Sequence, residues 1–137
     1  MQINEVMTPD VCITRPDQTI AEAARRMAEA DVGSLPVGDD EKLIGMVTDR
    51  DIVLRAVAKG LGSDTPVSEV MTGSIKYCYD DQEVGEVARN MAELGVRRLP
   101  VVNRDKRIVG VVALSNITHN ADGQSRDALL RGVAVPH

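Results

Sequence analysis

Aromatic residues are almost absent from this chain of 137 residues, which contains two tyrosines and neither tryptophan nor phenylalanine. Hydrophobic residues nevertheless make up 43% of the sequence, so we expect a core built from aliphatic side chains. A chain of this length can form one compact domain, or two small halves that are too weak to stand alone.

Cysteine and histidine are also scarce. The two cysteines, Cys12 and Cys78, are too few for a disulfide scaffold and stand in no metal-ligand spacing, so we expect both to be buried on strands. The two histidines, His119 and His137, offer little for catalysis by a nucleophile and a base. The sequence also lacks a P-loop and a glycine-rich dinucleotide turn. We therefore predict no catalytic residue, no metal site and no enzymatic activity.

Long apolar runs and excess positive charge are missing as well. No run approaches the roughly 20 apolar residues that span a bilayer. The first residues are neither basic nor apolar, unlike those of a signal peptide. The formal net charge of −5 disfavours a surface that attracts nucleic acid or anionic lipid. These features predict a cytoplasmic protein with no membrane association, for which nucleic acid is an unlikely partner.

The chain does contain an internal repeat. Glu5–Thr8 recurs 64 residues later as Glu69–Thr72, and Leu35–Val37 recurs at the same spacing as Leu99–Val101. One residue inserted in the following turn shifts the spacing to 65. Such a long period predicts paired subdomains rather than a solenoid. We divide the chain into a first repeat (residues 1–62), a second repeat (63–121) and a tail (122–137).

Each repeat is expected to fold as strand, helix, strand, strand and helix. In the first repeat, Thr19–Glu22 has the pattern of a capping box, in which the two side chains bond each other's backbone amides. The helix should present one apolar face, made of Ile20, Ala24, Met27 and Ala28. The predicted elements of the first repeat are a strand at Val11–Thr14, a helix at Ile20–Ala30, a hairpin over Leu35–Val47 and a helix from about Asp49 to Lys59.

The second repeat predicts the same order of elements. The tail contains one further short helix, Ser125–Gly132, which is too short to be stable alone in water. The predicted elements of the second repeat are Ile75–Tyr79, Val84–Leu94, Leu99–Val102, Ile108–Val112 and Ser115–Asn120.

The motifs occur in a recognisable order: Val-Met-Thr, then Leu-Pro-Val, then Gly45–Ile52, with Gly110–Ile117 as its counterpart. This order, doubled over about Ile3 to Ala121, resembles the CBS domain, named after cystathionine β-synthase. The resemblance implies an α/β fold of the α+β type, with two βαββα repeats related by a pseudo-two-fold axis. It also implies a regulatory module that binds AMP, ADP, ATP or S-adenosylmethionine between the repeats, with no cofactor required. Many family members are dimers, so we expect a homodimer that acts on an unknown protein partner.

The segment Thr48–Asp51 has two compatible interpretations. As local structure, Thr48 is the N-cap of a helix and Asp51 lies in its first turn. By the resemblance, Thr48 and Asp51 bind the ribose or phosphate of a nucleotide, and free amides at the helix start suit phosphate. Arg50 either pairs with a phosphate or is simply solvated.

Two arginines, Arg97 and Arg98, stand where the first repeat has Gly33 and Ser34. The resemblance implies that a basic residue here reaches phosphate in the cleft of the other repeat. The alternative is a surface pair held by acidic neighbours, which contributes little to stability.

The second repeat departs from the pattern, because Ala113 replaces the hydroxyl residue and Asn116 the carboxylate. Ser115 and Asn116 remain candidates for a second cleft, which is empty, weak or purely structural. The candidate residues lining the base pocket are Ile13, Thr14, Pro36 and Val37. On sequence alone, these residues are equally typical of a hydrophobic core.

Three functions are compatible with the sequence. The first is a sensor of an adenosine-containing ligand, and the second is a protein-interaction scaffold that has this fold but no physiological small ligand. The third, a small enzyme, lacks support because no nucleophile–base pair or metal constellation is present.

Overall fold

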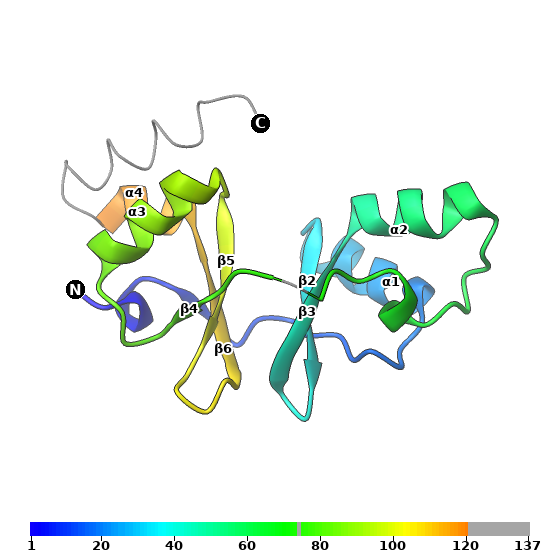
Figure 1. Cartoon of the computed structure of the whole chain (residues 1–137), viewed down its shortest axis with the longest axis horizontal. Coiled ribbons are helices and arrows are strands. Elements are labelled where there is room, and N and C mark those ends of the chain that lie inside the picture. The colour runs from blue at the N-terminus through cyan, green and yellow to red at the C-terminus, as the bar shows by residue number, and fades with distance from the viewer. Residues whose placement is uncertain (74, 121–137) are drawn as a thin grey trace. The chain divides into compact units, whose positions relative to one another are not determined.

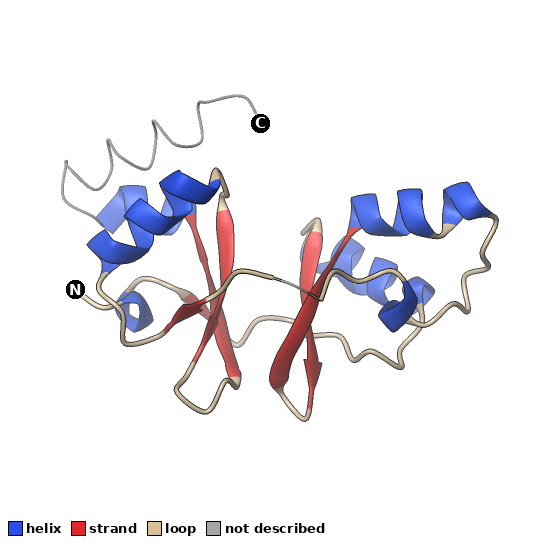
Figure 2. Cartoon of the chain, viewed as in Figure 1, coloured by secondary structure: helices blue, strands red, loops and turns tan. Residues whose placement is uncertain are grey.

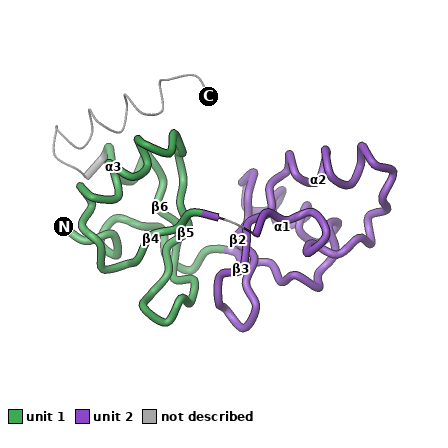
Figure 3. The backbone as a smooth tube through the Cα atoms, in the orientation of Figure 1, with its two compact units in different colours: residues 1–11, 76–137 green, residues 12–75 purple. Residues whose placement is uncertain are grey.

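The computed structural model describes residues 1–73 and 75–120. The chain is of the α+β type and divides into two compact units (Figure 3). Unit 1 contains Met1–Val11 and the chain from Lys76 onward, and unit 2 contains Cys12–Ile75. The short helix predicted at Ser125–Gly132 lies outside the described residues.

Unit 2 is a hairpin with two helices on the same side of it (Figures 1 and 2). Its strands β2 and β3 are antiparallel, which confirms the predicted hairpin. The strand predicted at Val11–Thr14 is reduced to a single parallel bridge between Thr14 and Val37. The elements of unit 2 are α1 (Ile20–Ala30), β2 (Ser34–Asp39), β3 (Lys42–Thr48), α2 (Asp49–Arg55) and the 3₁₀ turns η2 (Val57–Lys59) and η3 (Val67–Glu69).

Unit 1 repeats this plan with a four-stranded sheet in the order β1-β6-β5-β4. Strands β5 and β6 form the second predicted hairpin, and β4 pairs with β5 in parallel. The elements of unit 1 are η1 (Ile3–Glu5), β1 (Thr8–Pro9), β4 (Cys78–Tyr79), α3 (Val84–Leu94), β5 (Arg98–Val102), β6 (Ile108–Ala113) and α4 (Leu114–Asn120).

The start of each sequence repeat packs in the unit that holds the hairpin of the other repeat. Thr8 of β1 pairs with Val111 of β6, and Thr72 forms a bridge with Met46 of β3. We call the stretch around Thr8 in unit 1, and around Thr72 in unit 2, the crossing segment of that unit. In unit 2 it lies so close to the hairpin that a Cβ atom at Gly45 would be 2.7 Å from the Thr72 carbonyl oxygen. A Cβ at Gly110 would be 2.6 Å from the Thr8 carbonyl oxygen. This close approach explains why both hairpins have a glycine at this position.

The core of each unit is aliphatic, as the composition predicted. On α1, Ile20, Ala23 and Met27 are buried. The predicted apolar face was partly wrong, because Ala24 and Ala28 are exposed. Alanine is common on both faces of a helix, so the larger Ile20 and Met27 determine which side packs inward. The core of unit 2 is formed by Ile20, Ala23, Met27, Leu35, Val37, Val47, Ala56, Val67 and Val70.

The two cysteines differ in burial. Cys78 joins the core of unit 1, as expected, whereas Cys12 is only half-buried. Burial raises the pKa of the Cys78 thiol to about 12, and the charge of Asp80 adds to this effect.

The helix α1 starts with only half of the predicted capping box. The Thr19 side chain accepts a hydrogen bond from the Glu22 amide at 3.2 Å. The Glu22 carboxylate instead accepts from the side chain of Gln18, and Gln82 donates in the same way to Glu86. The repeated glutamine therefore bonds the first turn of the first helix in each repeat.

No helix within residues 1–73 and 75–120 has the length and apolar run needed to cross a membrane.

Candidate functional site

The candidate site is centred on the junction where β3 ends and α2 begins. Thr48 Oγ1 accepts a hydrogen bond from the Asp51 amide at 3.0 Å, and Asp51 Oδ2 accepts one from the Thr48 amide at 3.0 Å. The two residues therefore form a reciprocal capping box. The predicted role of Thr48 and Asp51 in capping the helix is confirmed.

The amides at the start of α2 already have acceptors. The Asp49 amide donates to the Gly33 carbonyl oxygen at 2.9 Å, and the Arg50 amide donates to Asp49 Oδ1 at 2.8 Å. The Asp51 amide is bonded to Thr48, as described above. The expectation of free amides for a phosphate was therefore wrong, because Gly33, Asp49 and Thr48 already accept from these donors.

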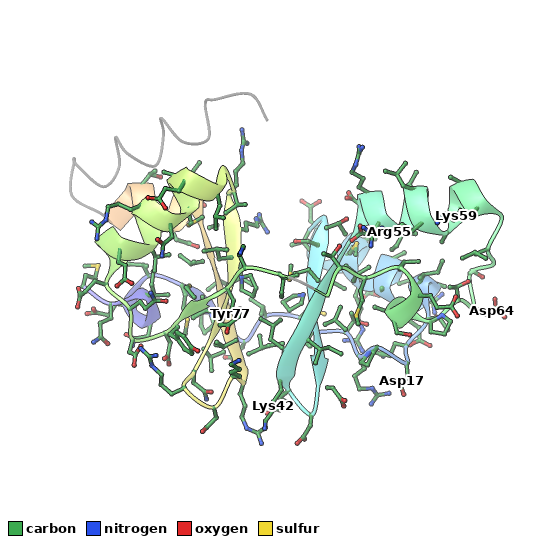
Figure 4. All side chains as sticks on the ribbon, viewed as in Figure 1. Asp17, Lys42, Arg55, Lys59, Asp64 and Tyr77 are labelled. Carbon is green, nitrogen blue, oxygen red and sulfur yellow. The ribbon has the colours of Figure 1, made fainter. Side chains whose placement is uncertain are left out.

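The Asp51 side chain is 14% exposed and keeps a second carboxylate oxygen beside the cap. Arg55 Nε lies 3.8 Å from this oxygen, Oδ1. The Arg55 guanidinium also donates to the carbonyl oxygens of Val70 and Met71, both at 3.2 Å. Arg55, labelled in Figure 4, thus links Asp51 to the segment that crosses the hairpin. Sequence reasoning missed this residue, although an arginine four positions after an aspartate on a helix is a recognisable pair.

The predicted lining of a base pocket lies in the centre of unit 2. Thr14, Pro36 and Val37 are buried, and Ile13 is half-buried. The Thr14 amide donates to the Pro36 carbonyl oxygen at 3.0 Å, and the Thr14 carbonyl accepts from the Gly38 amide at 2.9 Å. These backbone groups are bonded to one another, and of the four lining residues Ile13 has the most accessible surface.

The corresponding junction in unit 1 keeps half of the cap. The Ala113 amide donates to Asn116 Oδ1 at 2.9 Å, the same bond that Thr48 makes to Asp51. Ala113 has no hydroxyl group to accept from the Asn116 amide. Asn116 is half-buried and Ser115 is exposed.

The two candidate arginines, Arg97 and Arg98, lie at the start of the hairpin of unit 1. Arg97 and Arg98 are both exposed, and Arg98 is the first residue of β5, opposite Ala113. The Arg97 carbonyl accepts from the Leu114 amide at 2.8 Å, as the Gly33 carbonyl does from Asp49. The structure therefore places Arg97, Arg98, Ser115 and Asn116 in unit 1, and the other candidate residues in unit 2.

A cluster of two tyrosines and two cations in unit 1 was not anticipated. Tyr77 and Tyr79 meet edge to face with ring centres 5.7 Å apart, and the Arg104 guanidinium lies 4.0 Å from the Tyr79 ring centre. Hydrogen bonds from Tyr79 and Lys106 lower the pKa of Tyr77, which is labelled in Figure 4. Arg104 also bonds both oxygens of Asp81, at 2.9 and 2.7 Å, and lowers the pKa of that carboxyl.

Comparison with known families identifies the fold. The model of the CBS domain matches residues 3–57 and 67–123. The chain belongs to the CBS domain family. Among curated proteins, it is 40% identical over 118 residues to the CBS domain-containing protein YhcV of Bacillus subtilis, covering 86% of this chain and 84% of YhcV.

Solved structures of the family include complexes with adenosine compounds. CBSX2 in complex with AMP has a TM-score of 0.73 and 26% identity, covering 86% of this chain and 93% of CBSX2. The CBS domain pair of MJ0100, in complex with 5′-methylthioadenosine and S-adenosylmethionine, has a TM-score of 0.73 and 26% identity, covering 87% and 94%. The CBS fold of this chain is thus shared with proteins that bind such ligands.

Another similar structure contains metal. Hypoxic Response Protein I, solved with two coordinated zinc ions, has a TM-score of 0.79 and 35% identity, covering 89% of this chain and all of that protein. In the described part of the present chain, no three His, Cys, Asp or Glu side chains are grouped so that they could hold a metal ion.

Proposed function

We propose that this chain is a regulatory module that senses an adenosine-containing ligand, and that Asp51 is the central acceptor for the ribose. One Asp51 oxygen is fixed by the Thr48 amide, which orients the carboxylate before any ligand arrives. The other oxygen keeps acceptor capacity for a hydroxyl group, since its nearest cation is 3.8 Å away. A carboxylate that is oriented in advance and mostly shielded from water is a good acceptor for sugar hydroxyls.

The ligands of similar proteins support the nucleoside as the recognised part. AMP, 5′-methylthioadenosine and S-adenosylmethionine share adenosine and differ at the 5′ position, where the charge ranges from negative to positive. Only the common adenosine can be recognised in the same way in all three. In our proposal Thr48 and Asp51 bind the ribose, while Ile13, Thr14, Pro36 and Val37 form the surroundings of the base.

The 5′ group would be selected by arginine side chains. We assign this role to Arg50 of α2, to Arg97 just before β5 and to Arg98 at the start of β5, all of which are exposed. With the first-turn amides of α2 occupied, these guanidiniums are donors suited to phosphate. The proposed ligand is therefore an adenine nucleotide such as AMP, ADP or ATP rather than S-adenosylmethionine.

A thermal-shift panel tests the proposal. The protein is heated with AMP, ADP, ATP, adenosine, S-adenosylmethionine, NAD or GMP, each well above its expected Kd. A ligand at 100 times its Kd stabilises the folded state by about 2.7 kcal/mol, so at least one adenine nucleotide should raise Tm by several degrees, whereas GMP should not. No shift with any compound would favour the scaffold function, which the incomplete cap at Ala113 and Asn116 already makes a real alternative.

The role of the arginines is tested by comparing two ligands. Arg98→Ala should weaken binding of AMP much more than binding of adenosine, because it removes a charge-assisted contact to phosphate only. Arg104→Ala is the matched control, since it removes another exposed arginine of unit 1 that is paired with Asp81. Equal effects of the two substitutions on AMP binding would show that Arg98 acts only through net charge.

A further inference from the structure

Asp49 places a fixed negative charge beside the candidate site. It is the first residue of α2 and follows Thr48 directly in the chain. Its Oδ1 atom accepts a hydrogen bond from the Arg50 amide at 2.8 Å, so the carboxylate is held against the backbone of its own helix. Asp49 is exposed, and the ligand proposal above gives it no role.

The Asp49 carboxylate lies against a glycine. The Asp49 amide donates to the Gly33 carbonyl oxygen at 2.9 Å, and a Cβ atom at Gly33 would be 3.2 Å from Asp49 Oδ2. A side chain at residue 33 would therefore crowd the carboxylate. Glycine at this position leaves the carboxylate its place at the start of α2.

The second repeat differs in charge at both matched positions. Arg97 stands where the first repeat has Gly33, and Leu114 stands where it has Asp49. The Leu114 amide still donates to the Arg97 carbonyl oxygen at 2.8 Å. The backbone bond between the two positions therefore forms without a carboxylate, and the negative charge of Asp49 is a feature of the first repeat.

The charges that α2 brings to the site cancel one another. Asp49 and Asp51 are acidic, and Arg50 and Arg55 are basic. The Arg55 guanidinium already donates to two backbone carbonyl oxygens, whereas Arg50 is the cation that we assign to the 5′ group. Adjacent Cα atoms are about 3.8 Å apart, less than the Debye length of about 8 Å at physiological salt. The charge of Asp49 therefore acts on any ligand that its neighbours hold.

We propose that Asp49 is a specificity-determining residue, which limits the negative charge of the bound ligand so that the site prefers AMP to free ADP and ATP. This inference rests on the ligand proposal and narrows the ligand to a nucleoside monophosphate. The adenosine part is the same in all three nucleotides. Each further phosphate adds about one negative charge, which the Asp49 carboxylate repels.

A purely structural role for Asp49 is the competing account. A carboxylate in the first turn stabilises a helix through the helix dipole, and Asp49 has this position in α2. The two accounts differ in what they predict for binding. A change in the stability of α2 affects every ligand of the site equally, whereas a change in charge affects ligands according to their phosphates.

Calorimetric titration of Asp49→Asn without divalent metal ions tests the proposal. Asparagine keeps an oxygen for the Arg50 amide and removes only the charge, so the start of α2 should be preserved. An exposed charge pair changes affinity by about twofold to fivefold. The Kd for ATP should therefore fall by about fivefold to tenfold and that for AMP by about twofold, while that for adenosine should stay unchanged.

Asp64→Asn is the matched control, since it removes another exposed carboxylate of unit 2 (Figure 4) that lies outside α2. It changes the net charge by the same amount and should leave the ratio of the ATP and AMP affinities as in wild type. Circular dichroism of each variant verifies that it is folded.

Magnesium ions separate the charge of the ligand from its size. Mg²⁺ binds the terminal phosphates of ATP and neutralises part of their charge. The gain in ATP affinity caused by Asp49→Asn should therefore shrink to about the gain for AMP when Mg²⁺ is added. A gain that is the same with and without Mg²⁺, or the same for adenosine and ATP, would favour the structural role and overturn the proposal.

The outcomes also distinguish this inference from the ligand proposal. If wild type binds ATP as tightly as AMP, or if Asp49→Asn leaves the ratio of the two affinities unchanged, this inference is wrong and the ligand proposal stands. If wild type binds no adenine compound at all, both are wrong.

Discussion

The helix that follows the hairpin begins with a complete cap in unit 2 and with half of one in unit 1. In unit 2, Thr48 and Asp51 exchange two hydrogen bonds, and in unit 1 the Ala113 amide donates to Asn116 but Ala113 has no hydroxyl group for the reverse bond. The bond that both units keep is the one that orients the acidic or amide side chain. What unit 1 lacks is the hydroxyl and the carboxylate, the groups that could also serve a ligand. One such bond is therefore present where each helix begins, and the hydroxyl and carboxylate of unit 2 are the groups that we propose to bind the ligand.

The largest expected contrast between the units concerns their cysteines. Cys78 of unit 1 is buried with a pKa near 12 instead of 9.0, so its thiolate population at pH 8 is lower by about a thousandfold. A thiol-reactive dye should therefore label one cysteine, the half-exposed Cys12, well before the other. Mass spectrometry of the labelled peptides identifies the site.

Fast labelling of Cys78 in the folded protein would contradict the packing of unit 1.

The raised pKa of Cys78 also predicts that stability depends on pH, because the folded state binds the Cys78 proton more tightly than the unfolded chain does. The free energy of unfolding that it contributes should be present below about pH 9 and be lost as pH rises toward 12.

The next effect should be equal in the two units. Gly45→Ala and Gly110→Ala each place a methyl group within 2.7 Å or less of a backbone carbonyl oxygen, of Thr72 and Thr8 respectively. Backbone cannot yield as a flexible side chain does, so each substitution should lower the free energy of unfolding by about 3 kcal/mol, the upper part of the range for overpacking. Urea denaturation measures both. If only one variant is less stable, the crossing segment packs closely against the hairpin in only one of the two units.

Exchanging the cap residues between the two units should change the free energy of unfolding in opposite directions. Thr48→Ala removes the acceptor for the Asp51 amide and should lower the free energy of unfolding by about 1 kcal/mol. Ala113→Thr supplies the missing acceptor in unit 1 and should raise it, by at most a similar amount. If the second variant is neutral or destabilising, the half-cap of unit 1 is limited by packing rather than by the missing hydroxyl.

The smallest effect concerns the ends of the first helices. Asp31 ends α1 and Gly95 ends α3, both in the left-handed conformation, with φ of 55° and 68°. Glycine adopts this conformation without the strain caused by a Cβ atom, so Asp31→Gly should stabilise the protein by about 0.5 kcal/mol. Thermal denaturation detects it, and a loss of stability would mean that the Asp31 side chain has a role beyond this turn.

Much of the architecture could be predicted from the repeat. The bounds of α1 and α3 agree with the prediction, because large apolar residues recur at helical spacing in both, although the apolar face of α1 was partly misassigned. Both hairpins were predicted because each has two short apolar runs separated by a polar turn. The turns η1 and η3 were missed, because three-residue turns leave no periodic pattern and form only when Ile3 and Val67 enter a core.

The site was predictable in its residues and less so in its chemistry. The capping pattern at Thr48 and Asp51 is local, so sequence alone could identify it. The occupation of the Asp49 amide by Gly33 depends on a contact between separate elements, which spacing does not reveal. The bonds from Arg55 to Val70 and Met71 are long-range for the same reason.

We propose that Asp51 binds the ligand and that its counterpart Asn116 contributes less to binding. Asp51→Asn is the most direct probe, because asparagine makes the same cap bond in unit 1 and should therefore preserve the start of α2. Calorimetric titration with AMP should show affinity reduced about tenfold or more for Asp51→Asn, as expected when a donor loses a charged acceptor, while Asn116→Ala stays near wild type. Equal losses for the two variants, or none for Asp51→Asn, would contradict the account.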